Sequence, residues 1–120
     1  MQVFLSQTAY DQLQDIILYL EDNWPERVRD NFLDKLARSM DIMGSMPYIF
    51  PPSEKFPGLR KCVITPQTTA YYRVDEIRKE VEIIAVLDNR RPVGKTFDVK
   101  ESEILLYAAR YREFIPPYLW

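Results

Sequence analysis

The sequence predicts an α+β fold: an N-terminal strand and an α-helical hairpin packed on a twisted antiparallel β-sheet, plus a C-terminal helical extension. Two stretches before residue 47 carry apolar residues at three- and four-residue steps, which is typical of amphipathic helices. Three short runs between residues 58 and 93 are rich in β-branched and aromatic residues, which is typical of strands. The 120 residues, 47% of them hydrophobic, are enough for one compact domain with a core.

The chain opens with a short predicted strand and the first predicted helix. In Gln2–Leu5, Val3 and Leu5 share one face and Phe4 takes the other, which indicates a short edge strand. Ser6 or Thr8 is suited to cap the helix that follows. The residues expected on its buried stripe are Tyr10, Leu13, Ile16, Ile17, Leu20 and Trp24.

A second helix is expected directly after the first. Asn23 interrupts the first apolar pattern, and Pro25 is well suited to the first turn of a new helix, which runs to about Met46. Such a short connection favours an antiparallel hairpin. The apolar residues expected to face the core are Val28, Phe32, Leu36, Met40 and Met43.

A proline-rich loop separates this hairpin from three predicted strands. Four prolines between residues 47 and 57 exclude regular helix and central strand there. Lys61–Thr65 and Thr69–Val74 follow as strands, joined by a turn at Pro66 and Gln67. Val81–Leu87 is apolar on both faces, which predicts the centre of the sheet.

The last quarter of the chain has a helical pattern of its own. Residues 100–113 follow Pro92, and Ser102 is suited to cap a helix there. The tail after this stretch is apolar and interrupted by prolines, so we expect it to dock on its own domain or on a partner. The residues expected on the apolar stripe are Ile104, Leu105, Ala108, Tyr111 and Phe114, followed by Tyr118, Leu119 and Trp120.

Composition excludes several classes of site. The chain has no histidine, which rules out histidine general bases, His-ligated zinc and His-based triads, and we expect neither a cofactor nor a metal. The one cysteine, Cys62, is expected to be a small buried hydrophobe inside a strand. No stretch approaches the length needed to cross a bilayer and none resembles a leader, so we expect no membrane partner and a cytoplasmic location.

Charge is distributed unevenly along the chain. Residues 1–46 contain eight acids and four bases, whereas residues 58–100 contain nine bases and six acids. The helical half is therefore anionic and the sheet half cationic. A cationic face can attract nucleic acid or an acidic protein segment, and an ordinary solvated surface is the alternative.

The strongest candidates for function are two adjacent arginines, Arg90 and Arg91, after the third strand of the sheet half. Two guanidinium groups there can grip phosphate or carboxylate, although pairing with Asp88 or Glu82 is the alternative. Arg60 and Lys61 are further candidates, or simply polar positions on a strand.

Two neighbouring residues on the middle strand of the sheet half are also candidates. Tyr71 and Arg73 share one face, while Tyr72 is expected in the core with Ala70 and Val74. An aromatic ring beside a cation can stack on a base or contact a partner, so Tyr71 is a candidate binding residue. Core packing of Tyr71 is the alternative.

Three segments together, Gly58-Leu59-Arg60-Lys61, Tyr71-Tyr72-Arg73-Val74 and Asp88-Asn89-Arg90-Arg91-Pro92, carry a family resemblance. In their order and spacing the chain resembles the RelE/ParE family of type II toxin–antitoxin toxins, in its ParE-like branch. The resemblance implies a toxin domain over residues 1–93. Residues 94–120 would then be an extension, expected to be helical and packed on the same domain.

The resemblance also implies a function and partners. A ParE-like toxin, of the kind associated with plasmid stabilisation, acts by binding a protein target such as DNA gyrase and is neutralised by a cognate antitoxin. The alternatives are a ribosome-dependent mRNA endoribonuclease and a non-toxic relative that serves as an interaction module. For the nuclease, the resemblance places the catalytic roles on Arg60, Lys61, Arg73 and Arg90.

The sequence departs from the nuclease pattern of the family at three places. RNA cleavage needs a base for the 2′-hydroxyl, cations for the charged phosphorane and a proton donor for the leaving oxygen. Cys62 stands where a second basic residue is expected, and Thr69 where active nucleases carry arginine. After Arg90 the nearest aromatic is Phe97, whose ring cannot move a proton. The acidic pI, near 5.2, also favours the binding toxin over an enzyme that approaches ribosomal RNA.

Overall fold

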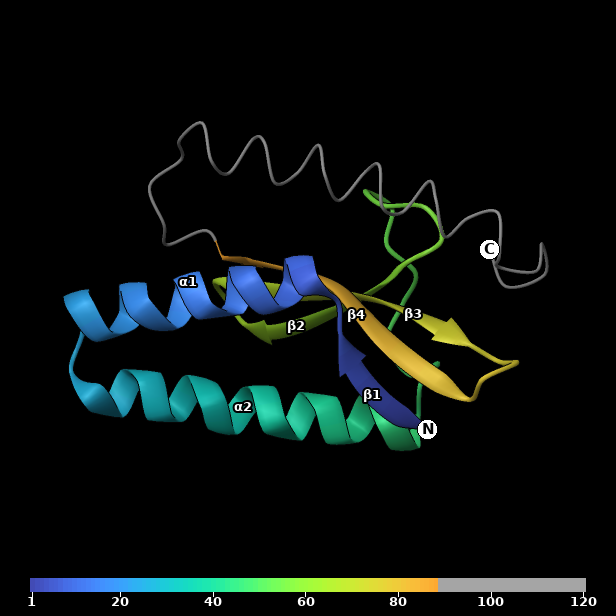
Figure 1. The fold of residues 1–120 in the computed structure, drawn as a ribbon, viewed down its shortest axis with the longest axis horizontal. Helices are drawn as coiled ribbons and strands as arrows, with labels where there is room; N and C mark the ends of the chain where they lie inside the picture. Colours follow the sequence, from blue (N-terminus) through green and yellow to red (C-terminus); the bar gives the residue numbers. More distant parts are fainter. Residues whose placement is uncertain (89–120) are drawn as a thin grey trace.

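The computed structural model describes residues 1–88, and these form two helices and four strands (Figure 1). The predictions about Arg90, Arg91, Phe97 and the extension 94–120 lie outside the described residues. The elements in chain order are β1 (Gln2–Leu5), α1 (Gln7–Asn23), α2 (Glu26–Ser45), β2 (Arg60–Thr65), β3 (Thr68–Asp75) and β4 (Glu80–Asp88). Each predicted strand and both predicted helices of this part are confirmed.

The strands form one sheet in the order β1-β4-β3-β2. β2, β3 and β4 are antiparallel neighbours, as predicted, and β4 lies inside the sheet. β1 is the edge strand that the sequence predicted, but it pairs parallel with β4, with Val3 opposite Val81, so the sheet is mixed. The two helices lie side by side and cover one face of this twisted sheet (Figure 1).

Helix α1 begins at the predicted cap, Ser6, whose hydroxyl accepts a hydrogen bond from the Ala9 backbone N–H at 3.0 Å. The buried stripe is rotated from the predicted one. Tyr10 is exposed, and Trp24 follows the end of the helix and is also exposed. The buried residues of α1 are Ala9, Gln12, Leu13, Ile16 and Leu20.

Helix α2 starts one residue after Pro25, and the hairpin connection is as short as predicted. Arg29 lies at this connection and pairs with Glu21 of α1 at 3.4 Å and with Glu26 at 2.9 Å. Phe32, Leu36 and Met43 are buried, in agreement with the apolar pattern.

A β-bulge in β4 changes the direction of its side chains. Tyr71 pairs with Ala85 and Tyr72 pairs with Ile83, which leaves Ile84 as an extra residue. Ile83 therefore packs in the core under the helices, whereas Ile84 and Ala85 both point to the other face. The uniform hydrophobicity of Val81–Leu87 hid this shift, because every position there is apolar except Glu82.

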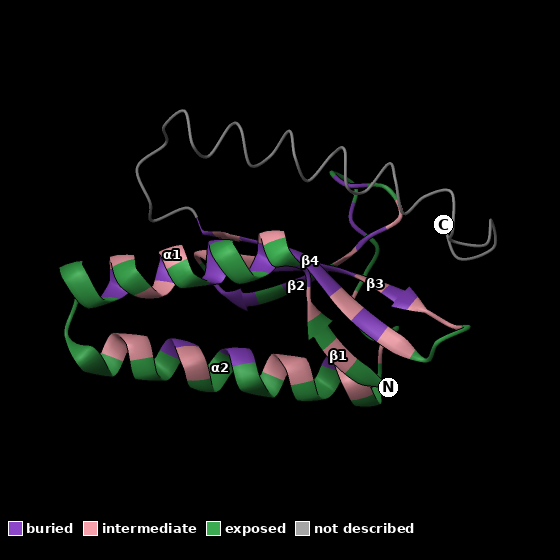
Figure 2. Cartoon of the chain, in the orientation of Figure 1, coloured by how far each residue is buried: buried purple, intermediate pink, exposed green. Residues whose placement is uncertain are grey.

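The core thus has two unequal parts, on the two faces of the sheet. The helix-side core lies between the helices and the sheet and includes Leu20, Phe32, Tyr72 and Ile83. The open-face cluster lies on the opposite face. It consists of Phe56, Leu59, Tyr71, Ile84 and Ala85, with Leu87 partly buried beside them. Figure 2 shows how buried positions alternate with exposed ones along both helices.

Residues 46–59 connect α2 to β2 without helix or strand apart from one bridge between Pro52 and Arg60. The Lys61 N–H donates to the Pro51 carbonyl at 2.9 Å, and the Ser53 N–H donates to the Leu59 carbonyl at 2.8 Å. The loop therefore covers the start of the outer edge of β2, which would otherwise offer unpaired backbone groups.

Within residues 1–88 neither helix is long and apolar enough to cross a membrane.

Candidate functional site

Arg60 is held at the start of β2 by the loop that precedes the strand. Its guanidinium donates to the carbonyl of Phe50 at 2.7 Å and to that of Tyr48 at 3.4 Å. Its Cζ also lies 4.8 Å from the centre of the Tyr48 ring, a cation–π contact. Arg60 thus fastens the loop to the sheet, and much of its hydrogen-bonding capacity is used inside the molecule.

The Tyr48 ring continues this set of contacts to the β3–β4 turn. Its hydroxyl donates to the carboxylate of Glu76, which also accepts from Lys79 Nζ at 3.0 Å. The hydrogen bonds from Tyr48 and then Lys79 lower the pKa of Glu76. Sequence reasoning missed this contact because Tyr48 lies in a loop and Glu76 in a turn, and neither has a periodic pattern.

Arg73 is also committed to partners within the sheet. Its Nε donates to Glu82 Oε1 at 3.1 Å on the neighbouring strand, and its Nη1 lies 3.6 Å from Asp75 Oδ2. The Arg73 side chain is only 13% exposed. Because Tyr72 precedes it on the helix-covered face and side chains alternate, Arg73 lies on the open face.

Asp75 shapes the β3–β4 turn as well as pairing with Arg73. Its Oδ1 accepts the backbone N–H groups of Ile77 and Arg78, each at 3.0 Å. Burial alone raises the pKa of Asp75, but the Arg78 hydrogen bond, the charge of Arg73 and the Ile77 hydrogen bond together lower it below its usual value.

The structure separates the two neighbouring basic residues of β2. Lys61 pairs with Tyr71 on the open face and is exposed, whereas Arg60 pairs with Tyr72, which belongs to the helix-side core. Tyr71 itself is 7% exposed, and its ring packs edge-on against Phe56 with 4.7 Å between ring centres. Core packing therefore accounts for Tyr71, and little of its ring remains for stacking.

Two side chains of the helix-side core, Tyr72 and Cys62, carry protons that can dissociate. The Tyr72 hydroxyl donates to the Pro47 carbonyl at 2.6 Å, and burial raises its pKa to about 12, although the charge of Arg60 acts to lower it. Cys62 is buried, as predicted, and burial raises the pKa of its thiol while a hydrogen bond with Ser39 acts in the opposite direction. Neither group is suited to exchange a proton near neutral pH.

Arg90 and Arg91 follow a well-fixed strand end. Asp88 is buried and accepts a hydrogen bond from the Thr68 hydroxyl at 2.5 Å, at the β2–β3 turn. Arg60 pairs with Tyr72, which follows Thr68 on β3 by four residues. The distance from Thr68 to Tyr72 along the strand is about 13 Å. The register therefore places Arg60 and the point where the chain leaves β4 at opposite ends of the β2–β3 pair.

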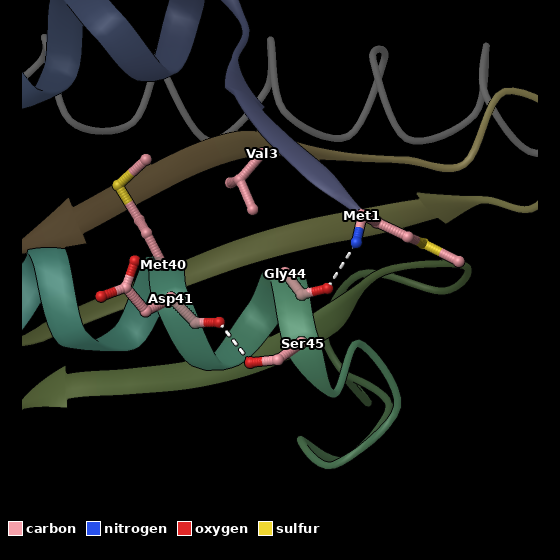
Figure 3. A pocket seen from close by; sticks show the side chains of 6 residues that line it. All are labelled: Met1, Val3, Met40, Asp41, Gly44 and Ser45. Atoms are coloured by element: carbon pink, nitrogen blue, oxygen red, sulfur yellow. Dashed lines mark hydrogen bonds between the residues drawn. The ribbon is translucent and has the colours of Figure 1, made fainter.

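One groove lies away from all these residues, between β1 and the end of α2 (Figure 3). It encloses about 530 Å³ and is lined by Met1, Val3, Met40, Asp41, Gly44 and Ser45. The Met1 nitrogen donates to the Gly44 carbonyl at 2.7 Å. A side chain at position 44 would meet the Met1 carbonyl at 2.8 Å, so glycine is needed where the strand passes the helix.

Within residues 1–88 no group of three or more acidic or cysteine side chains is arranged to hold a metal ion. On the open face Lys61 is exposed, whereas Arg73 is engaged in contacts within the sheet.

Comparison with known proteins places this geometry in a family. A family model described as the ParE toxin of the type II toxin–antitoxin system, parDE, matches residues 3–93. No curated protein matches the chain at the sequence level.

Several solved structures share the fold. The structure of the chromosomal ParDE toxin–antitoxin system from P. aeruginosa superposes with a TM-score of 0.62 at 18% identity, covering 73% of this chain and 95% of that one. A YoeB/ParE toxin from Agrobacterium tumefaciens gives 0.54 at 15% identity, covering 73% and 98%. The RelBE2 toxin–antitoxin complex from Mycobacterium tuberculosis gives 0.51 at 17% identity, covering 72% and 88%. At these identities the structures establish the fold, and the family model matches three quarters of the chain, so this protein belongs to the ParE toxin family of type II toxin–antitoxin systems.

Proposed function

We propose that this ParE-family toxin acts by binding a protein target such as DNA gyrase and is kept silent by a cognate antitoxin. The observation that carries the proposal is the ParE family match over residues 3–93. Two of the similar structures are of toxin–antitoxin systems, which supports an antitoxin partner. Such a toxin would act in the cytoplasm, where its targets lie, and would contribute to plasmid stabilisation.

The geometry of the described residues supports binding over RNA cleavage. A nuclease must turn its cations toward the scissile phosphate. Arg60 donates to the carbonyls of Phe50 and Tyr48, and Arg73 pairs with Glu82 and Asp75. Both would have to give up internal partners to serve as catalytic cations.

Among the candidate catalytic residues of a nuclease, Lys61 is the one that supports the second candidate function. It is exposed on the open face, where a phosphate could reach it. A ribosome-dependent endoribonuclease using Arg60, Lys61, Arg73 and Arg90 is therefore the alternative that the test below must separate from the binding toxin.

Arg90 and Arg91 are the residues that we propose as the main contacts with the target. Both follow Asp88, which the Thr68 hydrogen bond fixes at the end of the sheet. Arg90 is the second residue after this anchor in the sequence. Two adjacent guanidinium groups can each bind a carboxylate bidentately.

The test is induced expression of the full-length protein and of an Arg90→Glu, Arg91→Glu variant in growing cells. The proposal predicts that the unaltered protein stops growth, that transcripts stay intact, and that the variant loses at least about tenfold in potency, as expected for two reversed charge contacts. Arg78→Glu is the matched control, because Arg78 is 73% exposed on the β3–β4 turn. We expect this control to remain toxic.

Two outcomes would overturn the proposal. Transcripts shortened at codon boundaries would identify the nuclease. Unaffected growth, with the protein folded and present, would identify a non-toxic interaction module.

A further inference from the structure

The open-face cluster and the helix-side core are both buried, but by different elements. Two helices supply the cover on one face of the sheet. On the other face, the members of the cluster that come from outside the sheet, within residues 1–88, are Phe56 and Leu59. Both belong to the loop that lies along the β2 edge.

Apolar surface continues on this face away from the loop. Leu87 on β4 is partly buried, and Val63, which pairs with Thr69 on β3, is 57% exposed. Thr69 also pairs with Leu87, so Val63, Thr69 and Leu87 form one row across three strands. This row lies at the end of the sheet where β4 leaves it.

The chain continues from that same end with a segment that the matched relatives lack. The P. aeruginosa structure is covered over 95% of its length by 73% of this chain, and the family match ends at residue 93. Beyond that point the sequence carries apolar residues at three- and four-residue steps: Ile104, Leu105, Ala108, Tyr111 and Phe114.

We propose that residues 100–114 dock through these apolar residues on the open face of the sheet, over Val63 and Leu87, next to the open-face cluster. Residues 89–99 can span about 35 Å when extended, more than the width of a four-stranded sheet, about 14 Å. The segment is attached to the same chain, so its effective concentration is in the millimolar range. A second copy or a dilute partner would have to compete with that concentration.

Docking of this segment would shield the exposed Lys61 and the row beside it from other molecules. The inference concerns only the contact within the chain and does not depend on which target the toxin has.

The experiment uses the full-length protein with Leu87→Cys as a reporter thiol and measures its rate of alkylation. Adding Ala108→Asp places a charge in the apolar stripe, and we expect the thiol at position 87 to react at least about tenfold faster because the contact opens. Adding Ala109→Asp instead is the matched control. It makes the same change one position along, outside the stripe, and should leave the rate unchanged.

Cys62 serves as an internal reference, because it is buried in the helix-side core and reacts only if the domain unfolds. Equal rates for the Ala108→Asp and Ala109→Asp variants would overturn the proposal. Protection of position 87 that rises with protein concentration, or that needs an added partner, would also overturn it. If Cys62 reacts in the Ala108→Asp variant, hydrogen exchange of the unaltered chain decides: slow exchange over 104–114 supports docking, and fast exchange there contradicts it.

Discussion

The two faces of the sheet differ in the types of side chain that they contain. The core on the helix-covered face is formed by apolar side chains such as Leu20, Phe32 and Ile83, which fill the space between helices and strands. The open face combines a small apolar cluster with Lys61 and the paired charges of Arg73 and Glu82. The helix-covered face therefore holds the larger apolar core, while the open face combines a smaller buried cluster with ion pairs and the exposed Lys61.

At the bulge in β4, two consecutive side chains point to opposite faces of the sheet and the alternation then shifts by one residue. Ile83 and Ile84 are both fully buried, yet they face opposite sides of the sheet. The start of α1 binds the backbone around the bulge. The Ser6 N–H and hydroxyl donate to the backbone carbonyls of Ile83 and Ile84 at 2.9 and 2.8 Å, and the Gln12 side-chain oxygen Oε1 accepts from the Val86 N–H at 2.8 Å.

The largest expected effect comes from comparing Ile83→Ala with Ile84→Ala. The two changes remove the same atoms from adjacent, equally buried positions. We expect Ile83→Ala to cost about 4 kcal/mol of the free energy of unfolding, because the helices cannot collapse into the cavity, and Ile84→Ala about 2 kcal/mol. Urea unfolding followed by circular dichroism measures both. A larger cost for Ile84→Ala would show that the open face contributes as much to folding as the helix-covered face.

A smaller effect is expected at Asp75, in the polar part of the open face. In the folded protein the pKa of Asp75 lies below its usual value, so ionised Asp75 stabilises the fold above that usual pKa, and this contribution is lost as pH falls through the folded pKa. Asp75→Asn should therefore lower the midpoint of unfolding at pH 7, and the difference from the unaltered protein should shrink below about pH 4. Asp34→Asn, at an exposed position of α2, is the control and should change little. A difference that persists unchanged into acid would show that the charge of Asp75 does not matter.

Much of the fold could be predicted because local patterns agree with tertiary packing. Runs of β-branched and aromatic residues predicted the strands, the proline at residue 25 predicted the connection between the helices, and Ser6 was a predicted cap of α1. Cys62 was correctly expected to be buried, since it alternates with exposed Lys61 and Val63 along β2.

The features that could not be predicted depend on contacts between distant segments. Tyr10 belonged to the expected stripe of α1, but the hydrogen bonds from Ser6 to β4 set the rotation of the helix and bury Ala9 and Gln12 instead. The four residues of β1 likewise give no indication that this strand pairs parallel with β4.

The candidate site was predicted as residue types but not as an arrangement. Arg60 and Arg73 lie on neighbouring strands, and only the structure shows that one holds the Tyr48 loop while the other pairs with Glu82. The sequence does not distinguish an arginine that binds a target from an arginine that pairs within its own chain.

The most direct test of the binding-toxin account is the supercoiling activity of purified DNA gyrase with increasing amounts of the full-length protein, alongside a messenger RNA on translating ribosomes. The account predicts that supercoiling is inhibited in proportion to the protein added while the messenger RNA stays intact. Unchanged supercoiling together with messenger RNA cut in the ribosome would contradict it.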